Sequence, residues 1–249
     1  MVGMSRGERK PRREATTAGR LGSRPCETLR VTATLPAADP LIGRFIRLDP
    51  FDEADTAELY RAIARPEVFA GGYGGGPAGL PADLAAFEAF ARSYYDAGDS
   101  AMPWTVRLRG GADDGRVVGA TKLADFDLPN ESTHIGWTAY DPGVWGTTVN
   151  PETKLLLLDL AFRNGFGRVK IQADANNARS RAAIERLGAR LDGVLRRHKR
   201  RADGSWRDSA VYSVIIDDWP AVRSGLEARL AAWGDRPVEA RRGGAADGT

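Results

Sequence analysis

The sequence has little of what several classes of protein require. Its 249 residues include a single cysteine, Cys26, which excludes an intrachain disulfide framework. Only two histidines, His134 and His198, accompany it, so no usual metal-ligand set exists and we expect no metal. No apolar run approaches the ~18 residues of a membrane span. The basic N-terminus also does not lead into an apolar secretory segment. These shortages favour a protein of the reducing cytoplasm without a membrane partner.

The excess of positive charge is small and unevenly distributed. The net charge is +3, and basic residues crowd the first thirty positions. No aromatic residues interleave there for base stacking, so a nucleic-acid partner is not favoured. Few apolar residues occur before position 39, and residues 234–249 are rich in glycine, alanine and charge. We therefore expect disordered tails at 1–38 and 234–249, with one domain at 39–233.

Between these ends, strand and helix patterns alternate. Alternating apolar residues indicate strands, and apolar residues at helical spacing between caps indicate helices. The predicted strands are 43–48, 104–109, 116–124, 133–140, 168–173, 191–199 and 207–216. The predicted helices are 52–65, 82–97, one from 150 that ends at Gly165, 177–187, and one from 217 or 218 to 233. This order predicts an α/β fold with a mixed sheet of about seven strands and helices on both faces.

Three helix boundaries rest on specific residues. Asp52 is expected to cap the first helix and Pro66 to stop it. Asn150, Pro151 and Glu152 are expected to open the third helix as N-cap, first-turn proline and early acid.

The stretch 135–154 carries the strongest chemical signal. A strand runs into a loop of small residues and then into a helix start, so several free backbone N–H groups and a positive dipole end converge. This arrangement indicates an anion site, with a plain strand–helix turn as the alternative.

Two motifs in this order resemble the GNAT superfamily of acetyltransferases. The window Trp145-Gly146-Thr147-Thr148-Val149-Asn150 stands where that family has a pyrophosphate loop, although only the second-position glycine is kept. Asn177-Ala178-Arg179-Ser180, leading to Leu187-Gly188, is similar to the family's Asn-x-x-Ser motif before Leu-Gly-Phe. With the hairpin segments 193–197 and 207–209, residues 40–233 resemble the branch of ribosomal-protein N-terminal acetyltransferases.

The resemblance implies that acetyl-CoA is the co-substrate. Its pantetheine would lie between the fourth and fifth strands and pair with backbone near Trp137 and Thr138. Asn177 and Ser180 would face the cofactor. Arg179 and Lys154 would contact phosphate or else lie on a solvated face. The pyrophosphate would be held by the backbone amides of Gly146, Thr147, Thr148, Val149 and Asn150.

The family transfers acetyl directly to a neutral amine, which requires a base and a proton for the leaving thiolate. We expect His134 as the base, directly or through water, with a structural strand histidine as the alternative. Glu131 and Asp125 are the substitutes. The family's tyrosine acid position is Ile184 here, which leaves Ser180 as the nearest hydroxyl or the thiolate to depart unaided.

The acceptor would be a primary amine on a small molecule or a protein N-terminus. Phe69, Tyr73 and Trp104 are expected either to line its pocket or to pack in the core. The glycine run 71–76 lacks the lysine–serine pair of a nucleotide loop and is expected to be a mobile connection beside the acceptor. The alternative function is a non-catalytic acyl-CoA-binding regulatory module, and a homodimer is left open.

Overall fold

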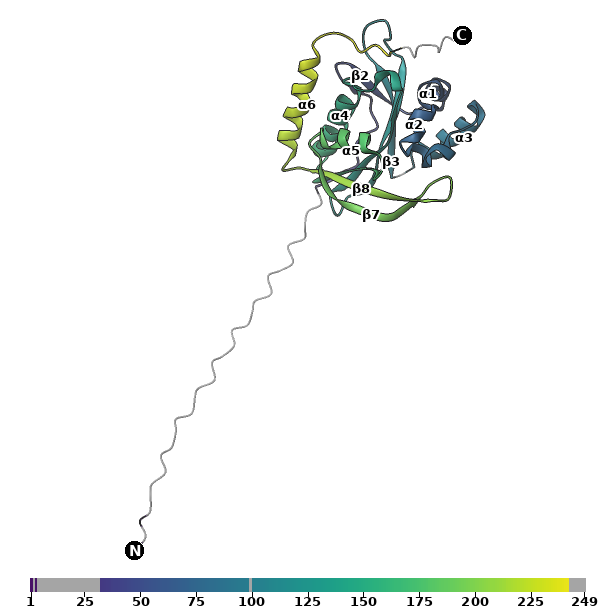
Figure 1. The fold of residues 1–249 in the computed structure, drawn as a ribbon. Coiled ribbons are helices and arrows are strands. Elements are labelled where there is room, and N and C mark those ends of the chain that lie inside the picture. The colour runs from purple at the N-terminus through teal and green to yellow at the C-terminus, as the bar shows by residue number, and fades with distance from the viewer. Residues whose placement is uncertain (2, 4–31, 99, 242–249) are drawn as a thin grey trace. The chain divides into compact units, whose positions relative to one another are not determined.

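The computed structural model describes residues 1, 3, 32–98 and 100–241. Cys26 and most of the expected N-terminal tail lie outside the described residues, as does the end of the chain from 242. Within the described ranges, six α-helices surround one mixed sheet (Figure 1). The expected fold class is confirmed.

The sheet has eight strands in the order β1-β2-β3-β4-β5-β6-β8-β7. Every neighbouring pair is antiparallel except β5 and β6, which run parallel. The strands are β1 (Leu41–Ile42), β2 (Ile46–Pro50), β3 (Ala101–Leu108), β4 (Val117–Asp127), β5 (Ser132–Tyr140), β6 (Arg168–Asp174), β7 (Arg190–Arg200) and β8 (Trp206–Ile215). The strand not expected from sequence is β1, because its two residues are too few for a detectable alternation.

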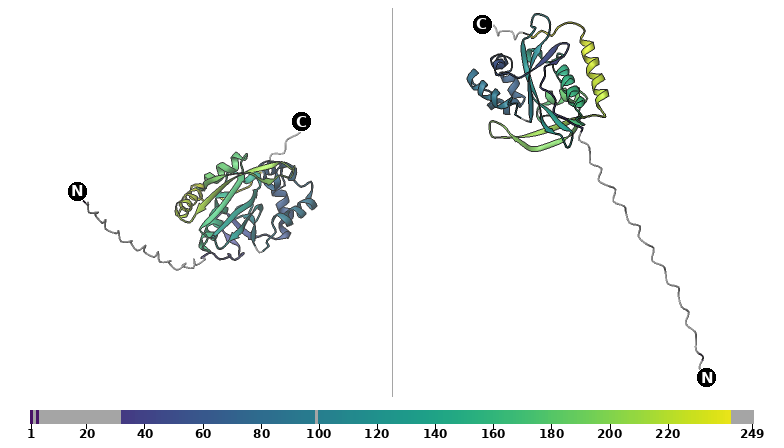
Figure 2. Two further views of the ribbon diagram at one scale, coloured as in Figure 1. Left: turned by 90° about the horizontal axis from the view of Figure 1, so that it is seen from below. Right: turned by 180° about the vertical axis from the view of Figure 1, so that it is seen from behind.

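Helices cover both faces of the sheet. The helices are α1 (Thr56–Ile63), α2 (Pro66–Ala70), α3 (Leu84–Tyr94), α4 (Val149–Arg163), α5 (Ala178–Glu185) and α6 (Trp219–Trp233). Seen from behind, α1–α3 and α6 lie on opposite sides of the sheet (Figure 2). Each face has its own apolar core. The sheet therefore carries two separate layers of helices.

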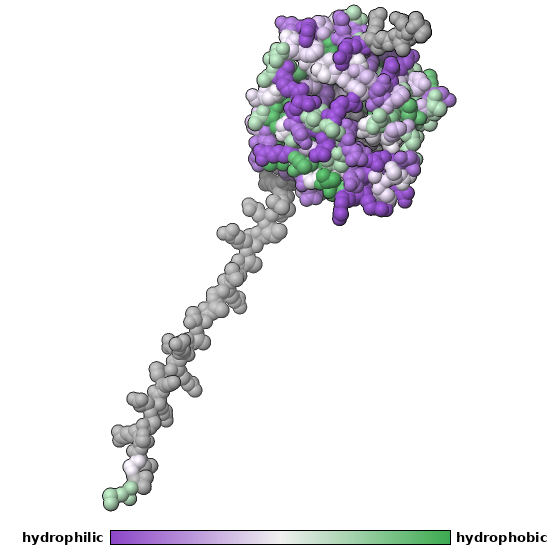
Figure 3. Space-filling model, viewed as in Figure 1, coloured by the Kyte–Doolittle hydropathy of each residue, from purple (hydrophilic) through white to green (hydrophobic). Residues whose placement is uncertain are grey.

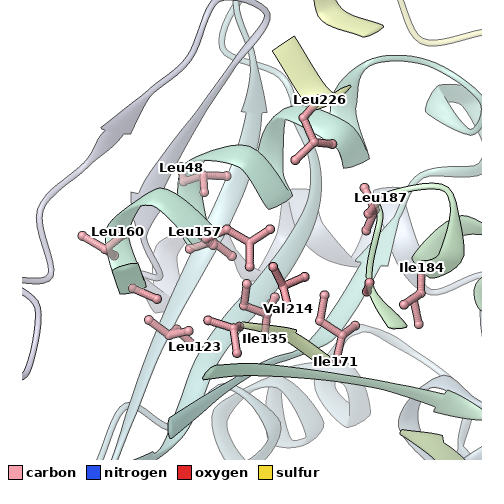
Figure 4. Packing of buried hydrophobic residues seen from close by; sticks show 14 of the residues in the cluster. Leu48, Leu123, Ile135, Leu157, Leu160, Ile171, Ile184, Leu187, Val214 and Leu226 are labelled. Atoms are coloured by element: carbon pink, nitrogen blue, oxygen red, sulfur yellow. The ribbon is translucent and has the colours of Figure 1, made fainter. Parts of the chain in front are cut away.

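The larger core lies between the sheet and the layer of α4 and α6. Leu123, Ile135 and Ile171 from the strands pack with Leu157 of α4 and Leu226 of α6 (Figure 4). Each of these five side chains is at most 4% exposed. The larger core therefore packs against the central strands, including β5 and β6.

Two predicted helix starts differ from the structure. Asp52 caps a short 3₁₀ turn, Glu53–Asp55, by accepting a hydrogen bond from the Ala54 amide, and α1 begins after it. Pro66 follows the end of α1 as expected but also begins α2, since proline fits the first turn of a helix. The cap of α4 is Thr148, two residues before the expected Asn150.

Each of the two expected tails includes residues that contact the domain. Thr32 donates hydrogen bonds to the Glu131 carboxylate, and the Thr34 amide donates to the Asn164 carbonyl. At the other end, Val238 is 1% exposed and the Ala240 amide donates to Asp113. The folded unit therefore extends beyond 39–233, to at least 32–241, because these short segments bury apolar side chains.

The surface mixes polar and apolar residues. On the face in Figure 3, hydrophilic and hydrophobic side chains are interspersed. Exposed large apolar side chains include Leu191, Val194 and Leu195 on the edge strand β7. The homodimer stays a prediction. Within the part of the chain that the structure describes, no helix has the length and apolar character needed to cross a membrane.

Candidate functional site

A cavity opens where β5 and β6 separate. The two strands pair only from Ser132–Arg168 to Ile135–Ile171, although β5 continues to Tyr140 and β6 to Asp174. The resulting cavity has a volume of about 540 Å³. It is lined by β5, by the loop before α4, and by parts of α4, α5, α2 and β8.

Strand β5 is irregular where it lines this cavity. Trp137 has φ +52, in the left-handed region that a bulky residue seldom adopts. Lys122 of β4 pairs with Gly136 while Ala120 pairs with Ala139, so β5 contains an extra residue between these pairs. A bulge of this kind frees backbone groups from the ladder, next to where the strands part. Trp137 and Thr138 both line the cavity, and their pairing with pantetheine stays a prediction.

The loop into α4 supplies unpartnered donors. Among the described residues, the backbone N–H groups of Gly146, Thr148 and Asn150 have no hydrogen-bond acceptor. Gly146, Thr147 and Asn150 line the cavity. Free N–H groups at a helix N-terminus attract anions through their partial positive charge.

Two of the expected loop residues have buried side chains. Thr148 is 4% exposed and Val149 is fully buried in the larger core. Neither lines the cavity, and the Val149 amide donates to the Thr147 hydroxyl, so of the two only Thr148 has a free backbone N–H within the described residues.

Arg179 is positioned by a tryptophan of the same loop. The guanidinium carbon of Arg179 lies 3.5 Å from the ring centroid of Trp145, a cation–π contact. The Trp145 indole N–H in turn donates to the Tyr140 carbonyl. Arg179 lines the cavity, which places a cation beside the free N–H groups.

Lys154 is buried on the cavity wall. It is 4% exposed, and its Nζ donates to the Thr138 hydroxyl at 3.1 Å. Burial lowers the pKa of Lys154 to about 7. No carboxylate among the described residues forms an ion pair with it, so its charge is available to a bound ligand.

Asn177 and Ser180 occupy the start of α5 and line the cavity. The Asn177 side chain accepts from the Ser180 amide at 2.9 Å and donates to the Gly71 carbonyl at 2.6 Å. Asn177 therefore caps α5 and ties it to the glycine run. Ile184 also lines the cavity, without a hydroxyl, as the sequence indicated.

The glycine run forms the 3₁₀ turn Tyr73–Gly75, and a second 3₁₀ turn, Pro77–Gly79, follows it. Besides the bond from Asn177, the Gly74 amide donates to the Tyr94 hydroxyl and the Gly75 carbonyl accepts from the Ala202 amide. The run expected to be a mobile connection is thus hydrogen-bonded to three separate segments.

His134 lies beneath this site rather than on the cavity surface. It is 2% exposed, and its Nδ1 lies 3.0 Å from the Asp125 carboxylate. Its Nε2 has no hydrogen-bond partner in the part of the chain that the structure describes, and a Cβ placed on Gly136 would lie 2.8 Å from it. Gly136 itself lines the cavity. Burial lowers the pKa of His134 to about 4, so the imidazole is neutral at pH 7.

The substitute bases are both engaged elsewhere. The Asp125 carboxylate lies between His134 Nδ1 and Lys170 Nζ, 3.1 Å away, and these two contacts hold its pKa well below its usual range. The Glu131 carboxylate accepts from Thr32, which lowers its pKa, and it does not line the cavity.

The three expected acceptor-pocket residues are placed differently. Tyr73 lines the cavity, and its hydroxyl lies 2.6 Å from that of Tyr95. Phe69 and Trp104 are each 0% exposed and belong to the two cores. Of the two readings left open, core packing therefore holds for Phe69 and Trp104.

Three cavity residues were not expected from sequence to have a role. Tyr94, Trp145 and Arg207 all line the cavity. Because side chains alternate along a strand, Arg207 lies on the same face as the fully buried Ser209. This alternation in the sequence could have indicated a role for Arg207. No sequence signal indicates that Trp145 stacks on Arg179, because the two come from different elements.

Comparison with known proteins agrees with this fold. The family model for the acetyltransferase (GNAT) domain matches residues 46–190. A protein from T. thermophilus assigned as an acetyltransferase is 32% identical, with a TM-score of 0.68 over 77% of this chain and 96% of that one. A GCN5-related N-acetyltransferase from Brucella melitensis is 26% identical, with a TM-score of 0.71 over 79% and 87%.

A more distant structure contains a form of the cofactor. Mycobacterium smegmatis RimJ in complex with CoA-disulfide shares the fold at 20% identity, with a TM-score of 0.56 over 78% of this chain and 92% of that one. No curated protein matches the chain. From the match of the family model to 46–190 and the 32% identity over most of its length, the chain belongs to the GNAT family of acetyl-CoA-dependent N-acetyltransferases.

Proposed function

We propose that the protein transfers acetyl directly from acetyl-CoA to a primary amine bound between α2, α3 and β5. The observation that carries this proposal is the set of unpartnered N–H groups of Gly146, Thr148 and Asn150 beside the opening between β5 and β6. These donors suit the pyrophosphate. The strand opening suits the pantetheine, and the backbone freed by the bulge at Trp137 suits its amides.

The cationic side chains around the cavity would bind the remaining cofactor groups. Arg179, stacked on Trp145, is placed to contact a phosphate. Lys154 would donate to a carbonyl of the pantetheine, because its ammonium has only the Thr138 hydroxyl as partner. Asn177 and Ser180 would contact the cofactor from α5, at the far wall of the cavity.

The transfer requires one bond to form and one to break. The amine nitrogen attacks the thioester carbonyl carbon, the C–S bond breaks, and the ammonium proton must leave before or during attack. The Asp125 carboxylate accepts a hydrogen bond from the Nδ1–H of neutral His134, so the ring's free lone pair lies on Nε2. His134 would take the proton through a water beside Gly136, and the Ser180 hydroxyl would protonate the thiolate unless it departs unaided.

A panel of primary amines tests this proposal against the non-catalytic module. Thiol release from acetyl-CoA should depend on the amine, and mass spectrometry should find the acetylated product. Protein N-terminal peptides and small amines form separate arms, which identify the acceptor class. Acetyl-CoA binding without turnover of any amine would favour the regulatory module.

Replacing Gly146 with valine should weaken acetyl-CoA binding at least about tenfold, or ~1.4 kcal/mol. Gly146 has φ +79, and a Cβ there would meet no protein atom, so the added bulk would occupy space needed by the phosphates. Calorimetric titration measures the affinity. Gly115→Val is the matched control, because Gly115 has φ +80, open surroundings and no contact with the cavity. Equal affinity in folded Gly146→Val and the parent would remove this loop from the site.

A further inference from the structure

Arg207 is a cavity-lining arginine without a partner. Its side chain makes no hydrogen bond or ion pair with any described residue, and its Nε is buried without an acceptor. Asp174, the acidic group whose charge most affects Arg207, is already paired with Arg201 at 2.7 and 3.1 Å. Leaving a guanidinium partly buried and unpaired is costly, which points to a ligand that completes the site.

A second cation faces the same region. Lys199 of β7 is directly opposite Arg207 in the antiparallel pair, so the two side chains share one face of the hairpin. Lys199 Nζ lies 5.9 Å from the Trp137 ring centroid and makes no hydrogen bond or ion pair within the described residues. Burial and the charge of Arg207 lower the pKa of Lys199. The two cations disfavour each other unless an anion lies between them.

This pair lies at the acceptor end of the cavity. Burial raises the pKa of the Tyr94 hydroxyl on α3, and the charge of nearby Arg207 offsets part of this rise. Asp174, which lies beside Arg207, also lies next to Gly72. The turn of the β7–β8 hairpin is hydrogen-bonded to Gly75. Figure 1 shows the hairpin extending toward α3. The phosphate-binding loop and Arg179, by contrast, are joined to each other through Trp145.

We propose that Arg207, with Lys199, binds an anionic group of the acceptor, so that the acceptor is a primary amine that also carries a carboxylate or a phosphate. This inference rests on the proposed transfer to an amine. A guanidinium binds a carboxylate or phosphate through two parallel N–H donors, which would fix the orientation of the acceptor as well as its affinity. The anion would be held on the hairpin side while the amine is directed to the thioester over Trp137.

The test uses pairs of amines that differ only in the anionic group. Suitable pairs are β-alanine and β-alaninamide, phosphoethanolamine and ethanolamine, and peptides with aspartate or asparagine as second residue. In at least one pair, kcat/KM should be at least about tenfold higher for the anionic amine, as expected for hydrogen bonds to charged groups. The pair that shows the preference identifies the anion and distinguishes a small acceptor from a peptide.

Variants then assign the preference to Arg207. In Arg207→Gln the ratio of kcat/KM within that pair should fall to within about twofold of one, mainly through KM, and Arg207→Lys should restore part of it. Arg196→Gln is the control, because Arg196 is an exposed arginine of the same hairpin with no contact to the cavity. It should leave the ratio unchanged.

The outcomes separate the two proposals. Turnover of amines without any preference for the anionic member would overturn the role of Arg207 and leave the acetyl transfer standing. A loss of acetyl-CoA affinity in Arg207→Gln would assign the guanidinium to the cofactor and also overturn the inference. If acetyl-CoA binds and no amine is turned over, the proposed transfer fails, and the inference fails with it.

Discussion

Replacing Glu152 with alanine should lower the free energy of unfolding by about 3 to 5 kcal/mol, because it leaves several backbone donors without an acceptor. The Glu152 carboxylate, 3% exposed in the first turn of α4, accepts from the amides of Arg44, Phe45 and Ile46 at 2.6, 2.8 and 2.9 Å. Phe45 and Ile46 are themselves buried, so water cannot easily replace the lost oxygen atoms. Urea unfolding followed by circular dichroism measures the change.

Two further variants make the interpretation specific. Glu152→Gln keeps one side-chain carbonyl oxygen and should lose less stability than the alanine variant. Glu53→Ala removes an exposed carboxylate that pairs with Arg92, and it should change stability by under about 1 kcal/mol. A loss of stability below about 1 kcal/mol in Glu152→Ala would show that the backbone amides of residues 44–46 find other acceptors.

His134→Gln should reduce turnover about 10²-fold, the low end of the range for general-base removal. Glutamine keeps approximate size and a hydrogen-bonding group toward Asp125 but has no basic nitrogen. Acetyl-CoA affinity should barely change, since His134 does not line the cavity. Steady-state kinetics with an accepted amine, together with the melting temperature of both proteins, measure the two effects.

Removal of a general base costs ~10²-fold or more in turnover. Turnover within about twofold of the parent at pH 7 would therefore show that another group or bulk water accepts the proton. A fall in melting temperature that matches the fall in rate would favour a structural role for the buried His134–Asp125 pair.

The pH dependence of the parent follows from the lowered pKa of His134. With a pKa of about 4, the imidazole is already neutral throughout pH 5 to 8. A rise of activity with pH in that range therefore reports deprotonation of the acceptor amine. The loss of activity caused by protonation of His134 should appear only near pH 4. The lowered pKa of His134 also affects the stability of the fold, because the folded state disfavours the protonated imidazole. The contribution of His134 to stability is complete above its ordinary pKa of 6.5 and is lost as the pH falls toward 4.

The order of strands and helices could be predicted because each depends on local patterns. The alternation along 168–173 is a property of contiguous residues, as are the helix-start residues 150–152 and the stop at Gly165, and β6 and α4 lie there. Boundaries were less well predicted where a tertiary contact competes with a local signal. The Asn150-Pro151-Glu152 run suits a helix start, yet α4 begins at Val149, because Val149 is buried in the core and Thr148 ends the loop.

The same contrast applies to the site. The loop at Gly146 and the helix start at Asn177 were found from sequence, since glycine, small residues and a cap are local signals of a strand–helix connection. Glu152 was interpreted as the early acid of a helix start, whereas its partners are amides more than a hundred positions earlier. Burial of Phe69 and Trp104 likewise depends on which elements cover them.

By itself, the sequence determined the family, the mixed sheet and the loop that precedes α4, because these follow from motifs and from periodicities within single segments. Only the tertiary structure decided which charges are paired and which are free. Within the described residues, Lys154 is buried without a carboxylate partner, Arg201 is paired with Asp174, and the Arg207 side chain has no partner at the cavity. Pairing of charges depends on distances across the sheet, and the spacing of residues along the chain does not encode those distances.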